Sequence, residues 1–581
     1  MTEGLNFSRR RRLPVIHAAE GAECGLVCLA MVANWHGLEI TLNALRQIFP
    51  PALSGVTLRG LMEQADRLGF ASRAARVDLD DLERIALPTI LHWRQGHFVV
   101  LKSISQSGAV IHDPAEGVRT LNLAALSEVF SGIILELEPG ADFRTATVGQ
   151  RLRLSDLWSS VTGLRSAVLT VAGLSLALQV VAFAIPLQIQ FVVDDVLSRG
   201  DDSIIWVIAL AFATLIVLQS ILEGLRAWSM QATAYSALFQ VMGNVVRHLT
   251  RLPLSWFEAR SVGDIMSRLA SATTIQDTLT RGVLTALLDG FTALVAAIFL
   301  FLYSPQLAFI VTSGVALNFI VTRVLYTPLR SRMQERITAS ANEQTHLIET
   351  VRASATIKTL GREAERVAEW RCRYAKAMNS LASIAKYHAG LQSAQTLING
   401  LQVVLVVAWG AHLVVHGEGL SAGMLIAFLA FRQIFSDRTT TFLNQLIEFR
   451  LLGLHLDRLG DIVQSPPEVP VGTVSPSFPA LGRLKLTDVG FRYGFSAPEV
   501  LGSIDVTVET GDFIAITGPS GGGKSTLLKL MIGLLVPTCG KIELEGAAAT
   551  PERWRHWRTQ LGFVSQDDRL LAGSIAENIA F

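Results

Sequence analysis

The stretch Phe513-Ile-Ala-Ile-Thr-Gly518-Pro-Ser-Gly-Gly-Gly-Lys524-Ser525-Thr526 decides the fold of the C-terminal part of the chain. The apolar residues 513–517 have the composition of a buried strand, and the periodic residues 527–532 predict a helix. Between them stands the spacing G-x-x-x-x-G-K-[ST] of a P-loop, in the strand–loop–helix context that this motif requires. The sequence therefore predicts an α/β phosphate-binding segment rather than a glycine-rich turn with a chance lysine.

The residue types of this loop are suited to holding a nucleotide. Glycines allow successive backbone N–H groups to converge on phosphate oxygens, and the helix N-terminus adds to the attraction. We expect Lys524 to reach the β- and γ-phosphates and Ser525 to coordinate Mg²⁺, so ATP and Mg²⁺ are the expected cofactors. The expected nucleotide-binding residues of the loop are Gly518, Ser520, Gly521, Gly523, Lys524, Ser525 and Thr526.

Composition places much of the remaining chain in a membrane. The chain has 581 residues, of which 50% are hydrophobic, and this length predicts several domains. The formal net charge of +1 gives no indication of nucleic-acid binding. Four cysteines form no disulfide framework and fit a reducing compartment. The basic run Arg9 to Arg12 is not followed by an apolar segment, so we do not expect a signal peptide.

Six apolar runs have about the length that spans a bilayer as a helix. They cover residues 166–188, 204–222, 284–303, 306–326, 394–416 and 421–436. The two long connections between these runs are rich in arginine, whereas residues 194–202 include four aspartates. The positive-inside rule then places the long connections and both termini in the cytoplasm. Buried helices of a soluble protein would not be expected to show this charge asymmetry.

Asp289 and Arg432 are charged residues inside or near the runs. Such residues face either the interior of a helix bundle or, near an interface, the polar headgroups, and the sequence leaves both alternatives open. Composition further predicts five segments. They are a soluble domain (1–147), a linker (148–165), the membrane domain (166–462), a second linker (463–483) and the nucleotide-binding segment (484–581).

The N-terminal domain contains a candidate cysteine nucleophile, Cys24. It precedes the helical stretch 25–35, whose N-terminus favours a thiolate. His97 opens one predicted strand and Asp113 closes the next, and a hairpin about residues 105–108 brings them nearly opposite each other. The trio predicts a nucleophile, a base and an orienting carboxylate. Without further motifs, a buried cysteine with two polar surface residues remains the alternative.

Two motifs around the P-loop and one between the apolar runs point to a known family. Tyr493 stands in Phe-Arg-Tyr-Gly ahead of the loop, and Gln566 stands in Val-Ser-Gln-Asp-Asp after it. Both patterns resemble the ATPase domain of ABC transporters, in which the aromatic residue stacks on adenine and the glutamine senses the γ-phosphate and Mg²⁺. Residues 251–268 resemble the first cytoplasmic loop of ABC exporters, whose coupling helix docks on the ATPase.

The N-terminal motifs narrow the resemblance. Glu23-Cys-Gly-Leu-Val-Cys-Leu-Ala-Met31, Leu91-His-Trp-Arg-Gln-Gly-His97-Phe-Val-Val-Leu101 and His112-Asp113-Pro-Ala-Glu-Gly117 resemble the double-glycine leader peptidase domain. This domain precedes the membrane spans in peptidase-containing ABC transporters of bacteriocins and microcins. The resemblance implies a multidomain fold: a papain-like α+β cysteine peptidase domain, an all-α six-span exporter domain and a partial α/β P-loop ATPase domain.

The resemblance also implies the chemistry and the partners. Cys24 would attack the carbonyl after Gly-Gly in a leader peptide, with His97 as base and then acid and Asp113 fixing the imidazole. The protein would be a homodimer in the lipid of the bacterial inner membrane, with its peptidase and ATPase domains in the cytoplasm. Its expected partners are a double-glycine precursor peptide, a periplasmic adaptor protein and an outer-membrane channel, with no nucleic acid.

One position departs from the family pattern, because Ala18 stands where the family has a glutamine that helps to form the oxyanion hole. Alanine has no side-chain donor, and losing one such donor typically costs about 10²–10³ in rate. We do not expect His17 to substitute, and we expect Cys28 to be packed core. Two main readings follow: an exporter that cleaves its substrate's leader, or the same scaffold with an N-terminal domain that only recruits the substrate. A membrane receptor or scaffold without transport is the third.

The sequence ends at Phe581 without the Leu-Ser-Gly-Gly-Gln signature, the Asp-Glu strand or the switch histidine of the family. In this family the signature of one subunit closes the ATP site of the other. We therefore expect residues 1–581 by themselves not to hydrolyse ATP.

Overall fold

The computed structural model describes residues 13–18, 23–50, 55–93, 96–149, 163–197, 202–417, 419–469, 482–495, 497–566 and 570–580. The chain divides into two compact units. The first comprises Met1–Gln47, Leu61–Leu249 and Ser261–Gln464, and the second Ile48–Gly60, Thr250–Arg260 and Ser465–Phe581. The basic run Arg9 to Arg12 and most of the two expected linkers lie outside the described residues.

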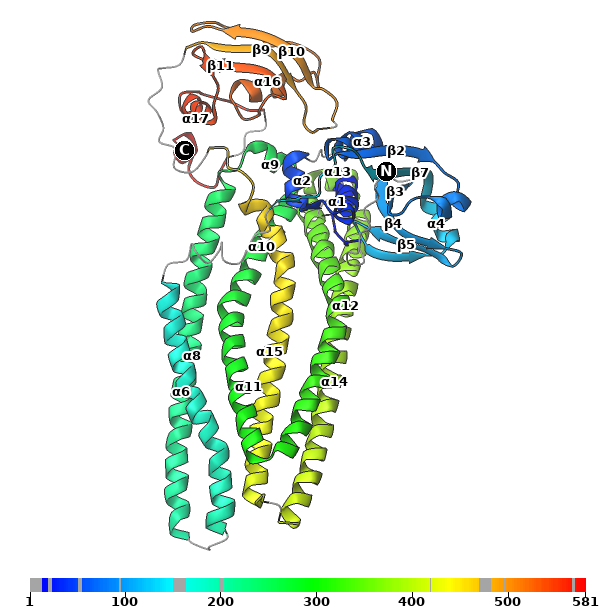
Figure 1. Cartoon of the computed structure of the whole chain (residues 1–581). Coiled ribbons are helices and arrows are strands. Elements are labelled where there is room, and N and C mark those ends of the chain that lie inside the picture. Colours follow the sequence, from blue (N-terminus) through cyan, green and yellow to red (C-terminus); the bar gives the residue numbers. More distant parts are fainter. Residues whose placement is uncertain are drawn as a thin grey trace. The chain divides into compact units, whose positions relative to one another are not determined.

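The N-terminal part of the first unit is a helix packed on an antiparallel sheet (Figure 1). The sheet has the order β2-β7-β3-β4-β5-β6, with bounds Phe70–Arg76, Phe130–Pro139, Thr89–Trp93, His97–Ser105, Gly108–Asp113 and Gly117–Leu121. Shorter elements surround it: β1 (Glu39–Ile40), β8 (Thr147–Val148), α2 (Leu42–Ile48), α3 (Leu58–Arg67), the 3₁₀ helix η2 (Leu79–Arg84) and α4 (Leu123–Val129). This arrangement matches the predicted α+β domain.

Helix α1 (Cys24–His36) is the central helix of this domain, and it packs against β4. Its first ten residues are all buried, because the stretch is apolar on every side and has no polar face to expose. Gly37 ends the helix with a positive φ of 99°, and its N–H donates to the last turn. The helix and the β4–β5 hairpin are confirmed where the sequence predicted them.

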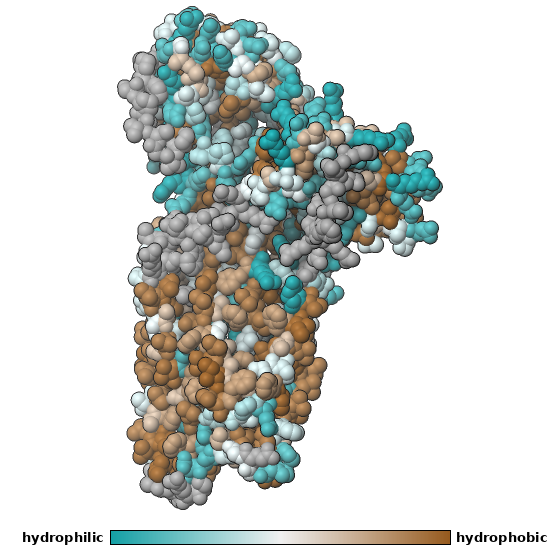
Figure 2. Space-filling view, viewed as in Figure 1, coloured by the Kyte–Doolittle hydropathy of each residue, from teal (hydrophilic) through white to brown (hydrophobic). Residues whose placement is uncertain are grey.

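The membrane part of the first unit consists of long helices. They are α6 (Leu164–Phe191), α8 (Asp202–Leu249), α10 (Val262–Asp277), α11 (Val283–Tyr303), α12 (Pro305–Arg352), α13 (Ser354–Leu360), α14 (Glu363–Val415) and α15 (Ala422–Val463), with π-helical turns η3 (Val192–Val196) and η4 (Thr278–Gly282). Among the described residues, five helices are long and apolar enough to cross a membrane, and they contain the first four predicted runs and all but the last residue of the fifth. Figure 2 shows hydrophobic side chains on the outer surface of these helices, as lipid contact requires.

The sixth predicted run, 421–436, lies in α15, which is not among those five helices. Three charged residues, Arg432, Asp437 and Arg438, lie in or next to its apolar end and lower its hydropathy. Helix α15 nevertheless packs along α11, and its Phe428 and Phe431 are fully buried in the core of the bundle. Its spanning of the membrane stays a prediction.

The second unit contains the ATPase-like segment, in which β10-β9-β11-β12 form an antiparallel sheet. The strands are β9 (Leu484–Phe491), β10 (Leu501–Val508), β11 (Cys539–Leu544) and β12 (Ala547–Ala548). The helices are α9 (Leu254–Glu258), α16 (Lys524–Met531), α17 (Pro551–Thr559) and α18 (Ile575–Ile579). Leu486, Val489, Leu530 and Trp554 form part of its core.

The prediction of a buried strand at residues 513–517 is wrong for this structure. The segment is not assigned as a strand, and Phe513 is 97% exposed. An apolar run forms a buried strand only when neighbouring strands take up its backbone hydrogen bonds and cover its faces. No strand in the described part of the second unit pairs with these residues.

Candidate functional site

Cys24 is the first residue of α1, and it is only 6% exposed. The His97 side chain and the backbone N–H groups of Phe98 and Gly25 all act to lower the pKa of its thiol. The helix N-terminus adds a positive partial charge to the same place. The residue is therefore held in surroundings that favour a thiolate.

His97 and Asp113 meet at one end of the β4–β5 hairpin. His97 Nε2 is 2.8 Å from Asp113 Oδ1, which also accepts a hydrogen bond of 2.8 Å from the N–H of Ala115. Asp113 is 2% exposed, so water does not compete for this carboxylate. Because Nε2 is engaged by Asp113, the other ring nitrogen, Nδ1, is the atom left to exchange a proton with Cys24.

The pKa values of the three groups favour an ion pair. Burial alone would raise the pKa of the Cys24 thiol, but hydrogen bonds with His97 and Phe98 outweigh it and lower that pKa. Burial opposes protonation of His97, yet its bonds with Asp113 and Cys24 raise its pKa to about 9. The pKa of Asp113 is lowered by His97 and the nearby N–H groups, in spite of burial. All three shifts favour the combination of thiolate, imidazolium and carboxylate.

Two further residues contact this trio, and sequence reasoning did not identify them. Trp93 is the ladder partner of His97 across β3 and β4, and the two rings meet edge to face at 5.7 Å. Arg119 Nη1 lies 3.9 Å from Asp113 Oδ2, and its guanidinium stands over the Trp93 ring at 5.8 Å. The signal that could have found them is strand order, because β3 and β6 flank the hairpin.

Ala18 lies in the segment ahead of α1 and is buried. Its backbone N–H donates to Pro114 O at 2.9 Å, so this group is already engaged. The ring of neighbouring His17 lies against Gly117. A Cβ atom at position 117 would come within 3.1 Å of the His17 ring. Burial lowers the pKa of His17 to about 4, although the negative charge of Asp113 acts to raise it. The ring is therefore neutral at pH 7. Ala18 has no side-chain donor and the His17 ring is uncharged, so neither residue supplies a charged donor to the site of Cys24.

Cys28 lies one helical turn after Cys24, is fully buried and belongs to the core, as predicted. Burial raises the pKa of its thiol well above the usual range, and the charges of Cys24 and Asp113 add to this effect. A thiol in such surroundings stays protonated and unreactive.

The P-loop connects β10 to α16 through residues with positive φ. Gly521 and Gly523 have φ values of 80° and 84°, and a Cβ at Gly523 would lie 2.7 Å from Leu501 Cδ2, so glycine is required there. Lys524 Nζ donates to the carbonyl oxygens of Gly518 and Pro519, at 3.0 and 2.6 Å. The ammonium group is thus folded over its own loop.

Tyr493, predicted to bind the nucleotide from outside the loop, lies against its end. The Tyr493 hydroxyl and Thr526 Oγ1 are 3.0 Å apart, so the tyrosine stands at the first turn of α16. Ser520 and Ser525 are exposed, and Gln566 is exposed in a turn next to residues that the structure does not describe. The exposed Ser525 hydroxyl is an oxygen ligand of the kind that Mg²⁺ prefers.

The predicted coupling loop contains the short helix α9, and its side chains contact the rest of the second unit. Glu258 Oε1 lies 2.7 Å from Lys529 Nζ on α16, the helix that the P-loop opens. Trp256 Nε1 donates to Ser465 Oγ at 3.1 Å, and Arg260 stacks over the Trp256 ring at 4.3 Å. The loop is therefore joined directly to the helix that begins at Lys524.

Asp289 and Arg432 both face the interior of the helix bundle. Asp289 is 3% exposed and accepts a hydrogen bond of 3.0 Å from Arg438. Arg432 is also 3% exposed and donates to Gln402 Oε1 and to Asn399 O, each at 2.8 Å. Of the two alternatives that the sequence left open, the interior position is the one observed.

Comparisons with known proteins match each part of the chain. The Peptidase C39 family matches residues 12–142, the ABC transporter transmembrane region matches residues 168–438, and the ABC transporter family matches residues 501–580. The chain is 33% identical to the probable microcin-H47 secretion/processing ATP-binding protein MchF of Escherichia coli, over 99% of this chain and 82% of that protein. It is 32% identical to the colicin V secretion/processing ATP-binding protein CvaB of Escherichia coli, with the same coverage.

A solved structure, that of a bacterial Atm1-family ABC exporter with ATP bound, has a similar fold. The TM-score is 0.65 at 21% identity, over 72% of this chain and 74% of that one. This likeness shows the exporter fold of the helical part.

Proposed function

Since the chain belongs to the peptidase-containing ABC transporters, we propose that it exports a bacteriocin- or microcin-type peptide and removes the double-glycine leader of that peptide. The observation that carries the cleavage step is the contact of Cys24, His97 and Asp113, in which a buried carboxylate holds a raised-pKa imidazole against a lowered-pKa thiol.

The geometry supports cleavage in two steps. The Cys24 thiolate attacks the carbonyl carbon of the second glycine, and the imidazolium of His97 gives its proton to the leaving amine of the mature peptide. The leader then remains on Cys24 as a thioester. His97, now neutral, takes a proton from water as that water attacks the thioester, which releases the leader carboxylate and restores the thiolate–imidazolium pair. Asp113 holds the ring in place throughout.

A second reading, in which the N-terminal domain recruits the peptide without cutting it, rests on Ala18. The missing side-chain donor leaves oxyanion stabilisation to backbone N–H groups, which slows cleavage but leaves the nucleophile and its base intact. The names of the two relatives above include processing and do not favour this reading.

We assign energy supply to the second unit. Lys524, Ser525 and the loop glycines would hold the phosphates of ATP, Tyr493 would contact adenine, and Gln566 with Ser525 would hold Mg²⁺. Bound Mg²⁺ would offset the negative charge of the phosphates. The contact of Glu258 with Lys529 supports transmission from this site to the membrane helices through α9. The expectation that residues 1–581 by themselves do not turn ATP over stays a prediction.

We further propose a homodimer in the bacterial inner membrane, with both soluble parts in the cytoplasm. The arginine-rich long connections between the spans support this orientation. A periplasmic adaptor and an outer-membrane channel complete the proposed assembly, and domain boundaries near residues 147, 166, 462 and 484 complete the proposed division of the chain.

The test is cleavage of a precursor peptide with a Gly-Gly leader by the full chain in lipid nanodiscs, followed by mass spectrometry. Release of a leader that ends in Gly-Gly is expected from the wild type. Cys24→Ala is expected to lower the rate by at least about 10⁴-fold, because no other group of the site is a nucleophile. Equal cleavage by both chains would refute the proposed function, and Cys28→Ala serves as the matched control because Cys28 is core.

A further inference from the structure

Glu23, the residue before the nucleophile, belongs to a buried network of ion pairs. Glu23 is 3% exposed, and both of its carboxylate oxygens are engaged by Arg46 of α2. Arg46 Nε donates to Oε1 at 2.8 Å and Nη2 donates to Oε2 at 2.7 Å. This bidentate contact fixes the carboxylate in both position and plane. Since Glu23 and Cys24 are consecutive, it also fixes the start of α1.

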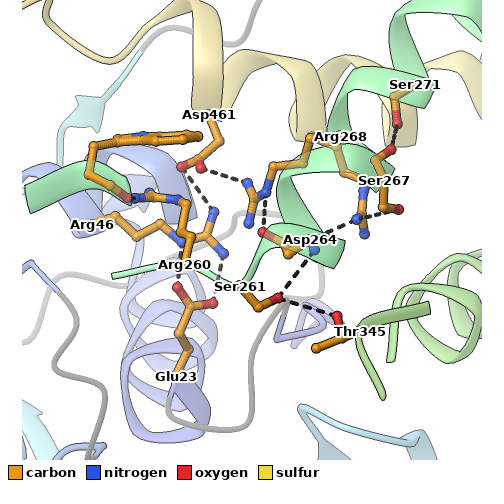
Figure 3. A network of polar contacts seen from close by, with 12 residues as sticks. Glu23, Arg46, Arg260, Ser261, Asp264, Ser267, Arg268, Ser271, Thr345 and Asp461 are labelled. Carbon is orange, nitrogen blue, oxygen red and sulfur yellow. Dashed lines mark hydrogen bonds and ion pairs between the residues drawn. The ribbon is translucent and has the colours of Figure 1, made fainter. Parts of the chain in front are cut away.

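The third guanidinium nitrogen of Arg46, Nη1, reaches the membrane domain. It donates to Asp461 Oδ1 at 3.2 Å, close to the end of α15. The other oxygen of Asp461, Oδ2, accepts a hydrogen bond of 2.6 Å from Arg268 Nη1 on α10. Arg268 in turn binds Asp264, so the network of ion pairs continues along α10. Figure 3 shows Arg46 and Arg268 on either side of the Asp461 carboxylate.

The charged groups of this network depend on one another. Glu23, Arg46, Arg268 and Asp461 are each less than 8% exposed. A buried charge without its partner is costly, so each member is held in place by its neighbours. The charge of Arg46 keeps the pKa of Glu23 lowered although burial alone would raise it. The N-terminus of α1 is therefore connected through two ion pairs to α15 and through a third to α10.

We propose that Arg46 is a positioning residue for leader cleavage, because it clamps Glu23 beside Cys24 and is itself anchored by Asp461 of α15. The inference rests on the proposed function and deepens it. When Asp461 is in place, Arg46 holds the start of α1 so that the sulfur faces His97. When Asp461 loses its charge, Arg46 keeps Glu23 and its hydrogen bond to Asn43 but loses its ion pair with α15, and the sulfur is held less firmly in line with the imidazole.

The sharpest test changes the membrane domain and measures the peptidase. Asp461→Asn is compared with Glu448→Gln, which likewise removes one negative charge from α15, at an exposed side chain. In nanodiscs, Asp461→Asn is expected to lower kcat for the precursor by about 10- to 100-fold with KM unchanged, since small misplacements of reacting groups have effects of this size. Glu448→Gln is expected to match the wild type.

A second readout needs no peptide. The alkylation rate of Cys24 by iodoacetamide, corrected with Cys24→Ala for the exposed Cys372 and Cys539, reports whether the sulfur still faces His97. Slower alkylation in Asp461→Asn supports the positioning role, even if the wild type cleaves no precursor and the proposed function fails. Equal kcat and equal alkylation in Asp461→Asn and Glu448→Gln would overturn the inference.

A conservative variant guards against misfolding. Arg46→Lys keeps the positive charge, so neither carboxylate is left alone, but one ammonium group cannot hold both oxygens of Glu23 and also reach Asp461. We expect a reduced kcat, unchanged KM and a melting temperature close to that of the wild type. A wild-type kcat in Arg46→Lys would contradict the role of the fork-shaped contact.

Discussion

The cysteine site and the P-loop are built in opposite ways. Cys24, His97 and Asp113 come from three elements, and each finds a partner in one of the others. Lys524 instead belongs to one continuous loop and donates hydrogen bonds to carbonyl groups of that same loop. The first site depends on how strands are paired, whereas the second depends on a short run of sequence.

This difference decides how each site responds to change. A site made of buried, mutually bonded groups has its pKa values set by those groups, so single substitutions shift its pH profile and rate. A loop of exposed backbone donors has little buried charge, so substitutions there change affinity and leave the surrounding fold in place. The predictions below test this contrast, in order of decreasing effect.

The largest effect is expected at Ala18. Ala18→Gln restores a side-chain amide at the oxyanion position and should raise kcat for leader cleavage by up to about 10²–10³-fold. The measurement is the initial rate of precursor cleavage by the full chain. Ala18→Met is the matched control, because it has similar volume and no donor. A gain that appears equally with methionine would show that packing and not hydrogen bonding is responsible, and no gain with glutamine would remove Ala18 as the limiting feature.

Much of the cysteine site could be predicted from sequence, because its elements are strongly patterned. The apolar run after Cys24 predicted α1, and the turn at residues 105–108 predicted the β4–β5 hairpin. The ladder pairs His112 with Val100, with a register shift beyond Leu101, so His97 and Asp113 are not direct ladder partners. Their side chains nevertheless meet at the end of the hairpin.

The missed features all depend on tertiary contacts. Arg119 reaches Asp113 only because β6 pairs with β5. The contact between Arg46 and Asp461 joins residues 415 positions apart, and no local pattern encodes such a pair. The strand expected at residues 513–517 failed for the complementary reason, because its pattern was local but the neighbours that a buried strand needs are not among the described strands.

The next effect is a shift in pH profile. The pair of Cys24 and His97 is active as thiolate and imidazolium, so activity should fall at low pH as the thiolate is protonated and at high pH as His97 loses its proton near pH 9. Asp113→Asn removes the charge that helps to hold this proton. We expect the alkaline limb to move down toward the ordinary histidine pKa of 6.5, which corresponds to about a 100-fold loss at pH 9.

The profile of kcat/KM against pH for the wild type and Asp113→Asn checks this shift. Asp142→Asn is a suitable control, since Asp142 is an exposed carboxylate of the same domain. An alkaline limb that stays at the same pH in Asp113→Asn would mean that Asp113 does not set the protonation of His97.

The smallest effect is expected at the P-loop, where one side chain shares its task with many backbone groups. Lys524→Ala should weaken binding of a fluorescent ATP analogue by about 10- to 100-fold, the size of one lost charge-assisted hydrogen bond, and should leave leader cleavage at the wild-type rate. Lys541→Ala, on strand β11 of the second unit, is the matched control for the loss of one positive charge. Binding rather than turnover is the appropriate measurement, because the loop alone is sufficient to attract phosphate. If Lys524→Ala also slowed cleavage, the two sites would not be separable in the way their construction implies, and the contrast between a paired and a self-contained site would fail.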